Sequence, residues 1–199
     1  MARKPAQVRR KDLVEAGLRV IAREGIHGAT VRAIVAEAGV PLATFHYVFD
    51  SRDEMIGEAY GYVVLPRVGE YRLPFEEGVE VVEAVRAVLL DWVERFAAQP
   101  EYEAAVMEIM AYCRRTPSLA HLPAAVQHRY VELIVTILRT ICDALGVEPV
   151  LPLEEIAPIV LHVTDGLTYC LIRTGDLEAS RRFVDVAAPM LAEAVVGRR

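Results

Sequence analysis

The sequence predicts an all-α protein with about nine helices in total. Apolar residues recur at helical spacing from one end of the chain to the other, and no alternating segment lies between paired turn residues, so we expect no strands. The 12 glycines and 11 prolines are scattered without a period, which excludes a collagen-like or linker-like chain. Because 54% of the 199 residues are apolar, the chain can bury a sizeable core.

The first part of the chain contains three helical segments in close succession. The first carries an apolar stripe and ends at Gly25. Its stripe consists of Leu13, Ala16, Gly17, Val20 and Ile21. Thr30 is a good N-cap for a second helix, which ends at Gly39. Pro41 suits the first turn of a third helix, expected over about 42–48.

Longer helices follow. Ser51 and Glu54 form a capping box, Ser-x-x-Glu, that opens the fourth helix. Its inward residues are expected to be Met55, Ile56, Ala59, Tyr60, Val63 and Val64. The remaining helices are predicted at about 77–98, 101–115, 121–145, 153–174 and 177–196. Because the segment 156–172 is apolar on nearly every face, we expect a second copy of the chain to cover part of it.

Cysteine usage and the N-terminal residues bear on the cellular setting. The three cysteines, Cys113, Cys142 and Cys170, are too few and too far apart for a disulfide scaffold or a Cys-x-x-Cys metal site. The charged start of the sequence is not followed by the apolar core of a signal peptide, and the apolar runs are shorter than a membrane span. We therefore expect a cytoplasmic protein that does not contact a membrane.

The charge of the chain is unevenly distributed. Its net charge is −6, which argues against nucleic-acid binding if the charge is evenly spread. Residues 1–52, however, hold nine Lys/Arg against five Asp/Glu, a net of +4, and the rest of the chain has a net of −10. Part of the excess comes from the cluster Arg3, Lys4, Arg9, Arg10 and Lys11, which is either an arm that follows a DNA minor groove or a solubilising tail.

Two short helices joined by a tight turn at Gly39 are the arrangement of a helix-turn-helix. The turn packs the second helix against the first, so the outer face of the second can enter a DNA major groove. That face offers Leu42, Ala43, His46 and Tyr47, with Thr44 towards the phosphates. Thr30 is first of all a helix cap, and it can also contact phosphate. We interpret Arg32 as a phosphate contact in preference to a solvated charge.

The stretch GIHGATVRAIVAEAGVPLATFHYVFDSRDEM, which begins at Gly25, resembles the DNA-binding domain of the tetracycline-repressor (TetR) family. The residues in register with the family pattern are Gly25, Thr30, Val31, Arg32, Ile34, Ala38, Gly39, Val40, Thr44, Phe49 and Ser51. The sequence departs from the pattern where His46 replaces the usual tyrosine, with Tyr47 one place along, and where Arg52 replaces the usual lysine. The resemblance implies that Arg52 contacts a phosphate.

The resemblance also implies a ligand site and a dimer in the second part of the chain. Members of the family usually hold a small effector among the middle helices, and pair through their last two helices. The candidate effector-binding residues are Tyr60, Trp92, Phe96, Met107, Met110, Tyr112, Cys113, His128, His162, Asp165, Thr168 and Tyr169. For most of these an ordinary core role is the simpler interpretation. Burial of the polar residues on the apolar helix without a partner is costly, so they either bond each other across the dimer or line a pocket. His162 and Asp165, three positions apart on one face, favour the pocket.

The candidates for the dimer contact are Leu167, Leu171, Phe183, Ala187, Met190, Leu191 and Ala194, with an ordinary core role as the alternative. No motif of an enzyme is present, and no cofactor is expected. His121 and His128 lie two helical turns apart, too far to share a metal ion unaided, so no metal site is expected.

These observations predict a helix-turn-helix DNA-binding domain over 1–52 and an effector-binding and dimerisation domain over 53–199. The function that they favour is a ligand-responsive homodimeric repressor, released from a near-palindromic operator by a small lipophilic effector. One alternative is a helical carrier or enzyme on the same fold that has lost DNA binding. Within the regulator class, an activator and a repressor that needs its ligand as co-repressor are further alternatives.

Overall fold

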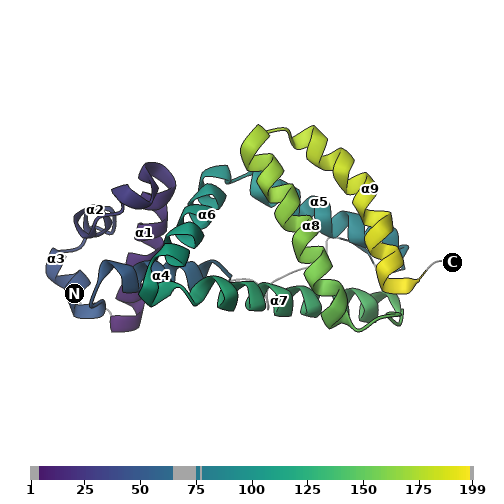
Figure 1. Cartoon of the computed structure of the whole chain (residues 1–199), viewed down its shortest axis with the longest axis horizontal. Coiled ribbons are helices and arrows are strands. Elements are labelled where there is room, and N and C mark those ends of the chain that lie inside the picture. The colour runs from purple at the N-terminus through teal and green to yellow at the C-terminus, as the bar shows by residue number, and fades with distance from the viewer. Residues whose placement is uncertain (1–4, 65–74, 77, 198–199) are drawn as a thin grey trace. The chain divides into compact units, whose positions relative to one another are not determined.

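Nine α helices and one short 3-10 helix form the part of the chain that the structure, a computed structural model, describes (Figure 1). That part covers residues 5–64, 75–76 and 78–197, and it contains no strand. The helices are α1 (Ala6–Gly28), α2 (Val31–Glu37), α3 (Leu42–Val48), α4 (Arg52–Val64), α5 (Val81–Ala97), α6 (Pro100–Arg115), η1 (Pro117–Leu119), α7 (Leu122–Leu145), α8 (Leu153–Thr174) and α9 (Leu177–Val196). The predicted all-α class is confirmed.

Most helices begin and end near the predicted positions. The structure differs at the start of α5 and by one additional short helix. Helix α5 begins at Val81 and not near residue 77, because Gly78 has a φ of 84° and the backbone of Glu80 is extended. The 3-10 helix η1 has no counterpart among the predicted helices. The predicted stop at Gly25 is present as a break, since this residue has a φ of 73° inside α1 and the chain continues for a short helical piece to Gly28.

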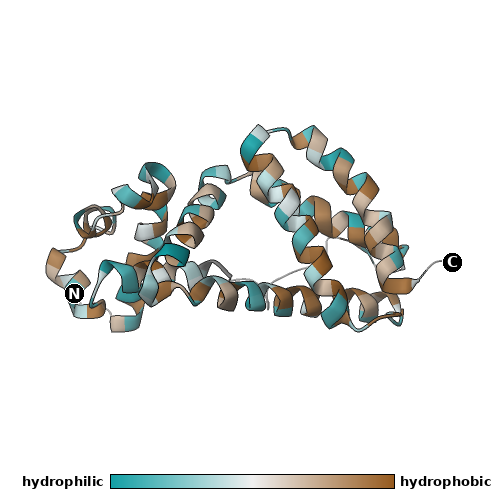
Figure 2. Cartoon of the chain, in the orientation of Figure 1, coloured by the Kyte–Doolittle hydropathy of each residue, from teal (hydrophilic) through white to brown (hydrophobic). Residues whose placement is uncertain are grey.

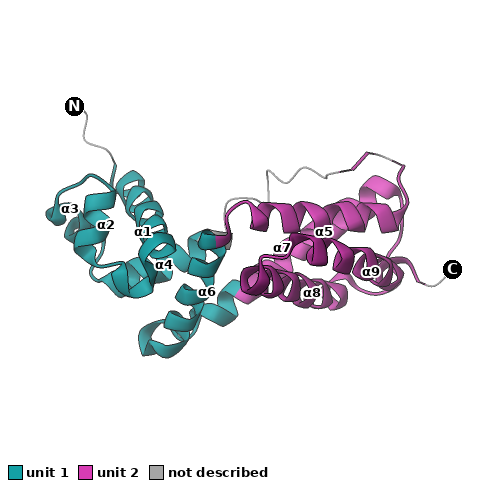
Figure 3. Ribbon diagram, turned by 90° about the horizontal axis from the view of Figure 1, so that it is seen from above, with its two compact units in different colours: residues 1–66, 101–126 teal, residues 67–100, 127–199 magenta. Residues whose placement is uncertain are grey.

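The chain divides into two compact units, which Figure 3 colours separately. Unit 1 consists of residues 1–66 and 101–126, and unit 2 consists of residues 67–100 and 127–199. Unit 1 therefore contains α6 as well as the helices α1 to α4. Whether residues 1–52 fold as a domain by themselves stays a prediction.

In unit 1, helix α1 packs against α2, α3 and α4. The predicted apolar stripe of α1 is buried, and so are Met55, Ile56, Ala59 and Tyr60 of α4. The side chains of Val63 and Val64, also predicted to face inward, lie outside the described part of the structure. Helices α1 and α4 approach closely at Gly17, where an added Cβ would lie 2.9 Å from the sulfur of Met55. A larger residue at this position would push the two helices apart.

In unit 2, helix α9 packs against α5 and α8, and α5 also packs against α8. One apolar cluster joins α5, α8 and α9 around Val85, Leu89, Val184 and Leu191. A second joins α7 and α8 around Leu138 and Ile156, together with Val195 of α9. Figure 2 shows hydrophobic and hydrophilic residues in turn along α8 and α9, as expected for helices with one buried face.

Helix α8 is the one helix in the described residues that is long and apolar enough, by length and composition, to cross a membrane. This corrects the expectation that no apolar segment reaches that length. In the structure, 39% of its most apolar window is buried inside the chain. A core helix of a soluble protein passes the same test, and α8 contributes to both apolar clusters of unit 2.

Candidate DNA-binding surface and effector cavity

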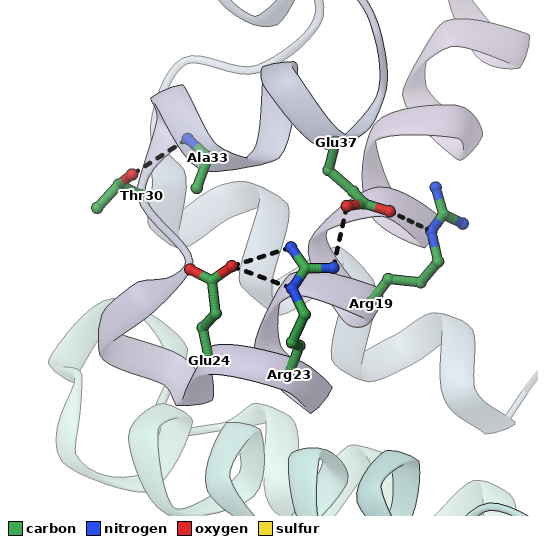
Figure 4. Close-up of polar contacts among 6 residues, drawn as sticks. All are labelled: Arg19, Arg23, Glu24, Thr30, Ala33 and Glu37. Atoms are coloured by element: carbon green, nitrogen blue, oxygen red, sulfur yellow. Dashed lines mark hydrogen bonds and ion pairs between the residues drawn. The ribbon is translucent and has the colours of Figure 1, made fainter.

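Both ends of α2 are fixed by hydrogen bonds, at its start by a side-chain cap and at the turn to α3 by backbone groups. The hydroxyl of Thr30 accepts from the N–H of Ala33 at 3.2 Å and caps α2, as predicted (Figure 4). At the other end of α2, Gly39 N–H donates to the carbonyl of Ala36, and the N–H of Val40 donates to the carbonyl of Val35. This is a Schellman motif, and its left-handed position is occupied by Gly39, whose φ is 64°.

Helix α3 has one buried and one open face. Phe45, Val48 and the following Phe49 are buried, and the rings of Phe45 and Phe49 lie 5.4 Å apart between centroids. On the opposite face, the side chains of Leu42 and Tyr47 are 43% and 60% exposed. Ala43 and His46 are exposed as well, and Thr44 is half-buried. The residues that we predicted to face DNA from α3 are therefore accessible, while the aromatic residues hold the helix in place.

Two arginines of α1 are engaged in ion pairs at the surface of the helix-turn-helix. Arg19 and Arg23 contact the two oxygens of Glu37 of α2 at 2.8 and 3.1 Å, and Arg23 also pairs with Glu24 at 2.9 Å (Figure 4). Hydrogen bonds from the two arginines lower the pKa of Glu37. Because these cations are balanced by nearby acids, the positive charge counted over residues 1–52 is only partly available to DNA.

The N-terminal basic cluster is also partly occupied. Arg10 of α1 donates to Glu54 and Glu58 of α4 and to the carbonyl of Val48, and its guanidinium lies 4.2 Å from the ring centroid of Phe49. Lys11 pairs with Glu15 at 3.8 Å. These contacts give Arg10 a structural role that the sequence did not indicate. Arg3 and Lys4 lie outside the described residues.

Arg52 makes internal contacts at the start of α4. Its Nε donates to the carbonyl of Ala29 at 2.6 Å, and its terminal nitrogens donate to the carbonyl of Ile26 and, at 3.1 Å, to the hydroxyl of Tyr112. The phosphate contact that the resemblance implied for this residue stays a prediction. Arg32 and Thr30, the other two predicted phosphate contacts, are exposed.

Helix α6 is hydrogen-bonded to α1 and α4 through this same region. The hydroxyl of Tyr112 donates to Asp53 at 2.6 Å, and burial together with this bond raises the pKa of Tyr112. One turn earlier, the carboxylate of Glu108 accepts from the N–H of Ile26 at 2.7 Å, directly after the break at Gly25. These bonds tie α6 to both α1 and α4 within unit 1.

Unit 2 contains a cavity of about 60 Å³ enclosed by α5, α7, α8 and α9. Its lining is almost wholly apolar, with Thr164 as a polar residue of α8. The lining residues are Val85, Val88, Leu89, Trp92, Tyr130, Leu133, Ile134, Ile137, Leu138, Ile141, Val160, Thr164, Leu191 and Val195. Trp92, the single tryptophan of the chain, stacks on Phe96 with centroids 4.8 Å apart and donates to Thr168 at 3.4 Å.

Of the predicted effector-binding residues, Trp92 is the one that lines this cavity. Phe96 and Thr168 contact the Trp92 side chain directly. Five other predicted effector-binding residues lie in unit 1: Tyr60, Met107, Met110, Tyr112 and Cys113. The remaining four lie in unit 2 and are exposed on their helices: His128, His162, Asp165 and Tyr169. The sequence signal for the lining of this cavity is the apolar face of α7, whose periodicity by itself indicates only a core role; the effector-binding roles of the other residues stay a prediction.

The exposed polar residues of α8 have local contacts. His162 Nδ1 lies 2.5 Å from the carbonyl of Pro158, one turn earlier. Desolvation by the surrounding protein raises the pKa of Asp165, and the neighbouring His162 opposes this shift. Among the described residues, no group of three or more His, Cys, Asp or Glu side chains is placed to hold a metal ion.

Comparison with known proteins identifies the class. A family model described as bacterial regulatory proteins of the tetR family matches residues 13–59, from the middle of α1 into α4. The chain is a TetR-type DNA-binding transcriptional regulator. Regulators of this type are not enzymes. The matched residues contain the complete helix-turn-helix described above.

Three similar proteins extend the comparison beyond the TetR helix-turn-helix. The chain is 26% identical over 166 residues to the nicotine-responsive transcriptional repressor HdnoR of Paenarthrobacter nicotinovorans, covering 79% of this chain and 80% of that protein. A TetR-family regulator from Rhodococcus has a TM-score of 0.72 at 23% identity, covering 94% and 99%. FadR of Bacillus subtilis, solved in complex with stearoyl-CoA, has a TM-score of 0.65 at 13% identity, covering 93% and 98%. The two structures show that the fold is shared along nearly the whole chain.

Proposed function

We propose that this TetR-family regulator is a cytoplasmic, homodimeric repressor that leaves its operator when a small lipophilic effector binds. The observation that carries the proposal is the open face of α3, where Leu42 and Tyr47 are 43% and 60% exposed although the opposite face is anchored by buried aromatic rings. A carrier that has lost DNA binding would not need a helix held in this way. In a dimer, two such helices reach successive major grooves about 34–36 Å apart.

An exposed apolar face on the last two helices supports the homodimer. Phe183, Val186 and Met190 of α9 are 50%, 65% and 66% exposed, and Ile159 and Tyr169 of α8 are about half exposed. Large apolar side chains gathered on one face of a monomer mark an interaction site. The other candidates divide: Leu167, Leu171, Ala187 and Leu191 are buried within the chain, and Ala194 is half-buried. The proposed contact therefore uses the outer faces of α8 and α9.

The apolar cavity of unit 2 supports a lipophilic effector. Its almost wholly apolar walls match an apolar ligand. At about 60 Å³ it is smaller than sites for drug-sized ligands, roughly 300–1,000 Å³, so we expect the helices around it to separate when the effector binds. HdnoR is named as nicotine-responsive and FadR was solved in complex with stearoyl-CoA, which supports a small-molecule effector for this chain as well.

Release of DNA requires that the effector bind more tightly to a conformation with low DNA affinity. By linkage, the operator must then weaken effector binding by the same factor. Helix α4 is our candidate for the connection, because it packs against α1, which in turn packs against α2 and α3, and because it is the last helix before the chain enters unit 2. Repression, in preference to activation, is the sign that the similarity to HdnoR supports.

DNA binding is tested by gel shift with the promoter region next to the coding sequence, comparing the wild type with Thr44→Ala and Tyr47→Ala. We expect salt-sensitive binding that each variant weakens without loss of the fold. Absence of salt-sensitive binding to any such fragment would favour the carrier.

The dimer is tested by light scattering. The wild type should have twice the 22.1 kDa mass of one chain, and Val186→Arg should shift it towards the monomer. Thr136→Arg, on an exposed position of α7, is the matched control and should leave the mass unchanged. A monomeric wild type would contradict the dimer.

The effector site is tested through Trp92, whose fluorescence reports on the cavity because the chain has no other tryptophan. Titration with 1-octanol as a small apolar probe should change the emission and lower DNA affinity together. Val88→Phe, which fills the cavity from α5, should abolish both responses while DNA binding remains. An unchanged response in this variant would place the effector elsewhere.

A further inference from the structure

Helix α3 lacks the side chains that most often read bases. Its seven residues, Leu42–Val48, include no Arg, Lys, Asn, Gln, Asp or Glu. Arg and Lys read guanine in the major groove, Asn and Gln read adenine, and Asp and Glu accept from cytosine. Because Thr44 is expected to face the phosphates, direct readout by α3 is limited to apolar groups, the hydroxyl of Tyr47 and the imidazole of His46.

Three consecutive apolar residues are exposed where α3 begins. Pro41, Leu42 and Ala43 are all exposed to solvent, although most apolar side chains around them are buried. A single exposed leucine is ordinary on a protein surface, but an exposed run of apolar residues needs a functional reason. The position is fixed, because Thr44 N–H donates to the carbonyl of Pro41 at 2.8 Å and the buried Phe45 anchors the next turn.

We propose that Leu42 and Ala43 select the operator by packing against the C5-methyl groups of thymines in the major groove. Thymine is the one base that presents a methyl group there, and apolar side chains are its natural contacts. The inference rests on the proposed function, since it requires that α3 enter the groove. It adds a base identity: each half-site should contain thymines opposite the start of α3, read by apolar contact and not by paired hydrogen bonds.

The size of the effect follows from the area involved. Burial of one methyl-sized group contributes about 0.8 kcal/mol, which corresponds to about a fourfold change in affinity. If both half-sites lose the same methyl group, the effects add to about sixteenfold. These factors are within the range of an anisotropy titration at fixed salt concentration.

The test uses the full chain and removes methyl groups from the DNA. A binding sequence is first selected from a library of randomised duplexes, and its thymines are then replaced one at a time by deoxyuridine, which pairs identically but lacks the C5-methyl. For wild-type protein we expect about a fourfold loss at one or two positions of a half-site. For Leu42→Ala we expect weaker binding to the thymine duplex and little further loss with deoxyuridine at one of those positions.

Thr44→Ala is the matched control on the same helix. It should lower the affinity for thymine and deoxyuridine duplexes by the same factor, so that the deoxyuridine loss stays at about fourfold. Circular dichroism should show unchanged folding of Leu42→Ala, because this side chain is 43% exposed and contributes little to the core.

The outcomes separate the two proposals. A selected sequence that binds tightly but tolerates deoxyuridine at every position would overturn the thymine readout and leave the repressor intact. A deoxyuridine loss that persists unchanged in Leu42→Ala and Ala43→Gly would also overturn it. If no sequence is enriched and binding is equal for all duplexes, the proposed function itself fails, and the thymine readout fails with it.

Discussion

Arg52 has two candidate roles, an internal hydrogen-bonding role in the fold and a contact with DNA phosphate. Substitution of this residue separates them, because each role predicts a different result. The resemblance to the TetR pattern implies a phosphate contact, whereas in the structure the guanidinium donates to the carbonyls of Ile26 and Ala29. Both carbonyls belong to buried residues at the junction of α1 and α2. The substitution Arg52→Ala removes both donors at once and leaves these acceptors without them.

The magnitude follows from those two bonds. A hydrogen bond to a charged group contributes about 1.5–3 kcal/mol, but Arg52 is half-buried, so water replaces part of what is lost. We therefore expect Arg52→Ala to lower the free energy of unfolding by about 2 kcal/mol in total. For a chain of this size, that corresponds to a melting temperature lower by about 4–8 °C.

The assay pairs thermal unfolding without DNA with the salt dependence of DNA binding. For Arg52→Ala we expect the lower melting temperature and an almost unchanged slope of log affinity against log salt. The comparison variant is Arg32→Ala, at an exposed position on α2, and it should show the opposite. Its melting temperature should be unchanged, and its slope of log affinity against log salt should be lower by about one unit for each phosphate that it no longer binds. An unchanged melting temperature with a reduced slope for Arg52→Ala would refute the structural role.

Three further predictions concern local features of unit 1. Gly39→Ala places a Cβ on a residue with a φ of 64°, and this should lower the free energy of unfolding by about 1–2 kcal/mol. Urea unfolding measures the loss, and an equally stable variant would contradict the left-handed turn. Burial raises the pKa of Cys113 to about 11, so little of the reactive thiolate is present at pH 8. Mass spectrometry should therefore show that iodoacetamide leaves Cys113 unmodified in the folded chain and alkylates it in urea. A hydrogen bond from Arg10 lowers the pKa of Glu54, so this pair stabilises the fold above the ordinary carboxyl pKa and loses that effect as the pH falls through the lowered value. Glu54→Gln should therefore reduce stability at pH 7 and have little effect at pH 3, and an equal loss at both pH values would argue against the pair.

The helix-turn-helix could be predicted closely because its signals are local. Thr30, Gly39 and Ser51 act on residues within a few positions along the chain, so their type and spacing define the caps and the turn without knowledge of the rest. The contacts of Arg10 and Arg52 could not be found in this way. Their partners lie 23 or more positions away, and nothing in the sequence pairs them.

The cavity shows the corresponding limit for the second half of the chain. Because apolar residues lie on more than one face of α8, its sequence pattern does not tell which face turns inward. The polar residues His162, Asp165 and Tyr169 were predicted to face a ligand, but the structure turns Val160 and Thr164 towards the cavity and exposes the other three. The facing residues of α7 and α9 determine this choice.

The sequence by itself determined the nine α helices of the described residues, most of their ends, the turn at Gly39 and the TetR-type helix-turn-helix, because each depends on residues close together in the chain. Only the tertiary structure decided that Arg52 bonds inward, that α6 joins the DNA-binding helices, and that aliphatic residues around Trp92 enclose the cavity. The reason is physical: a cavity or a long-range hydrogen bond exists only where distant segments meet. Which segments meet depends on how the faces of several helices pack together.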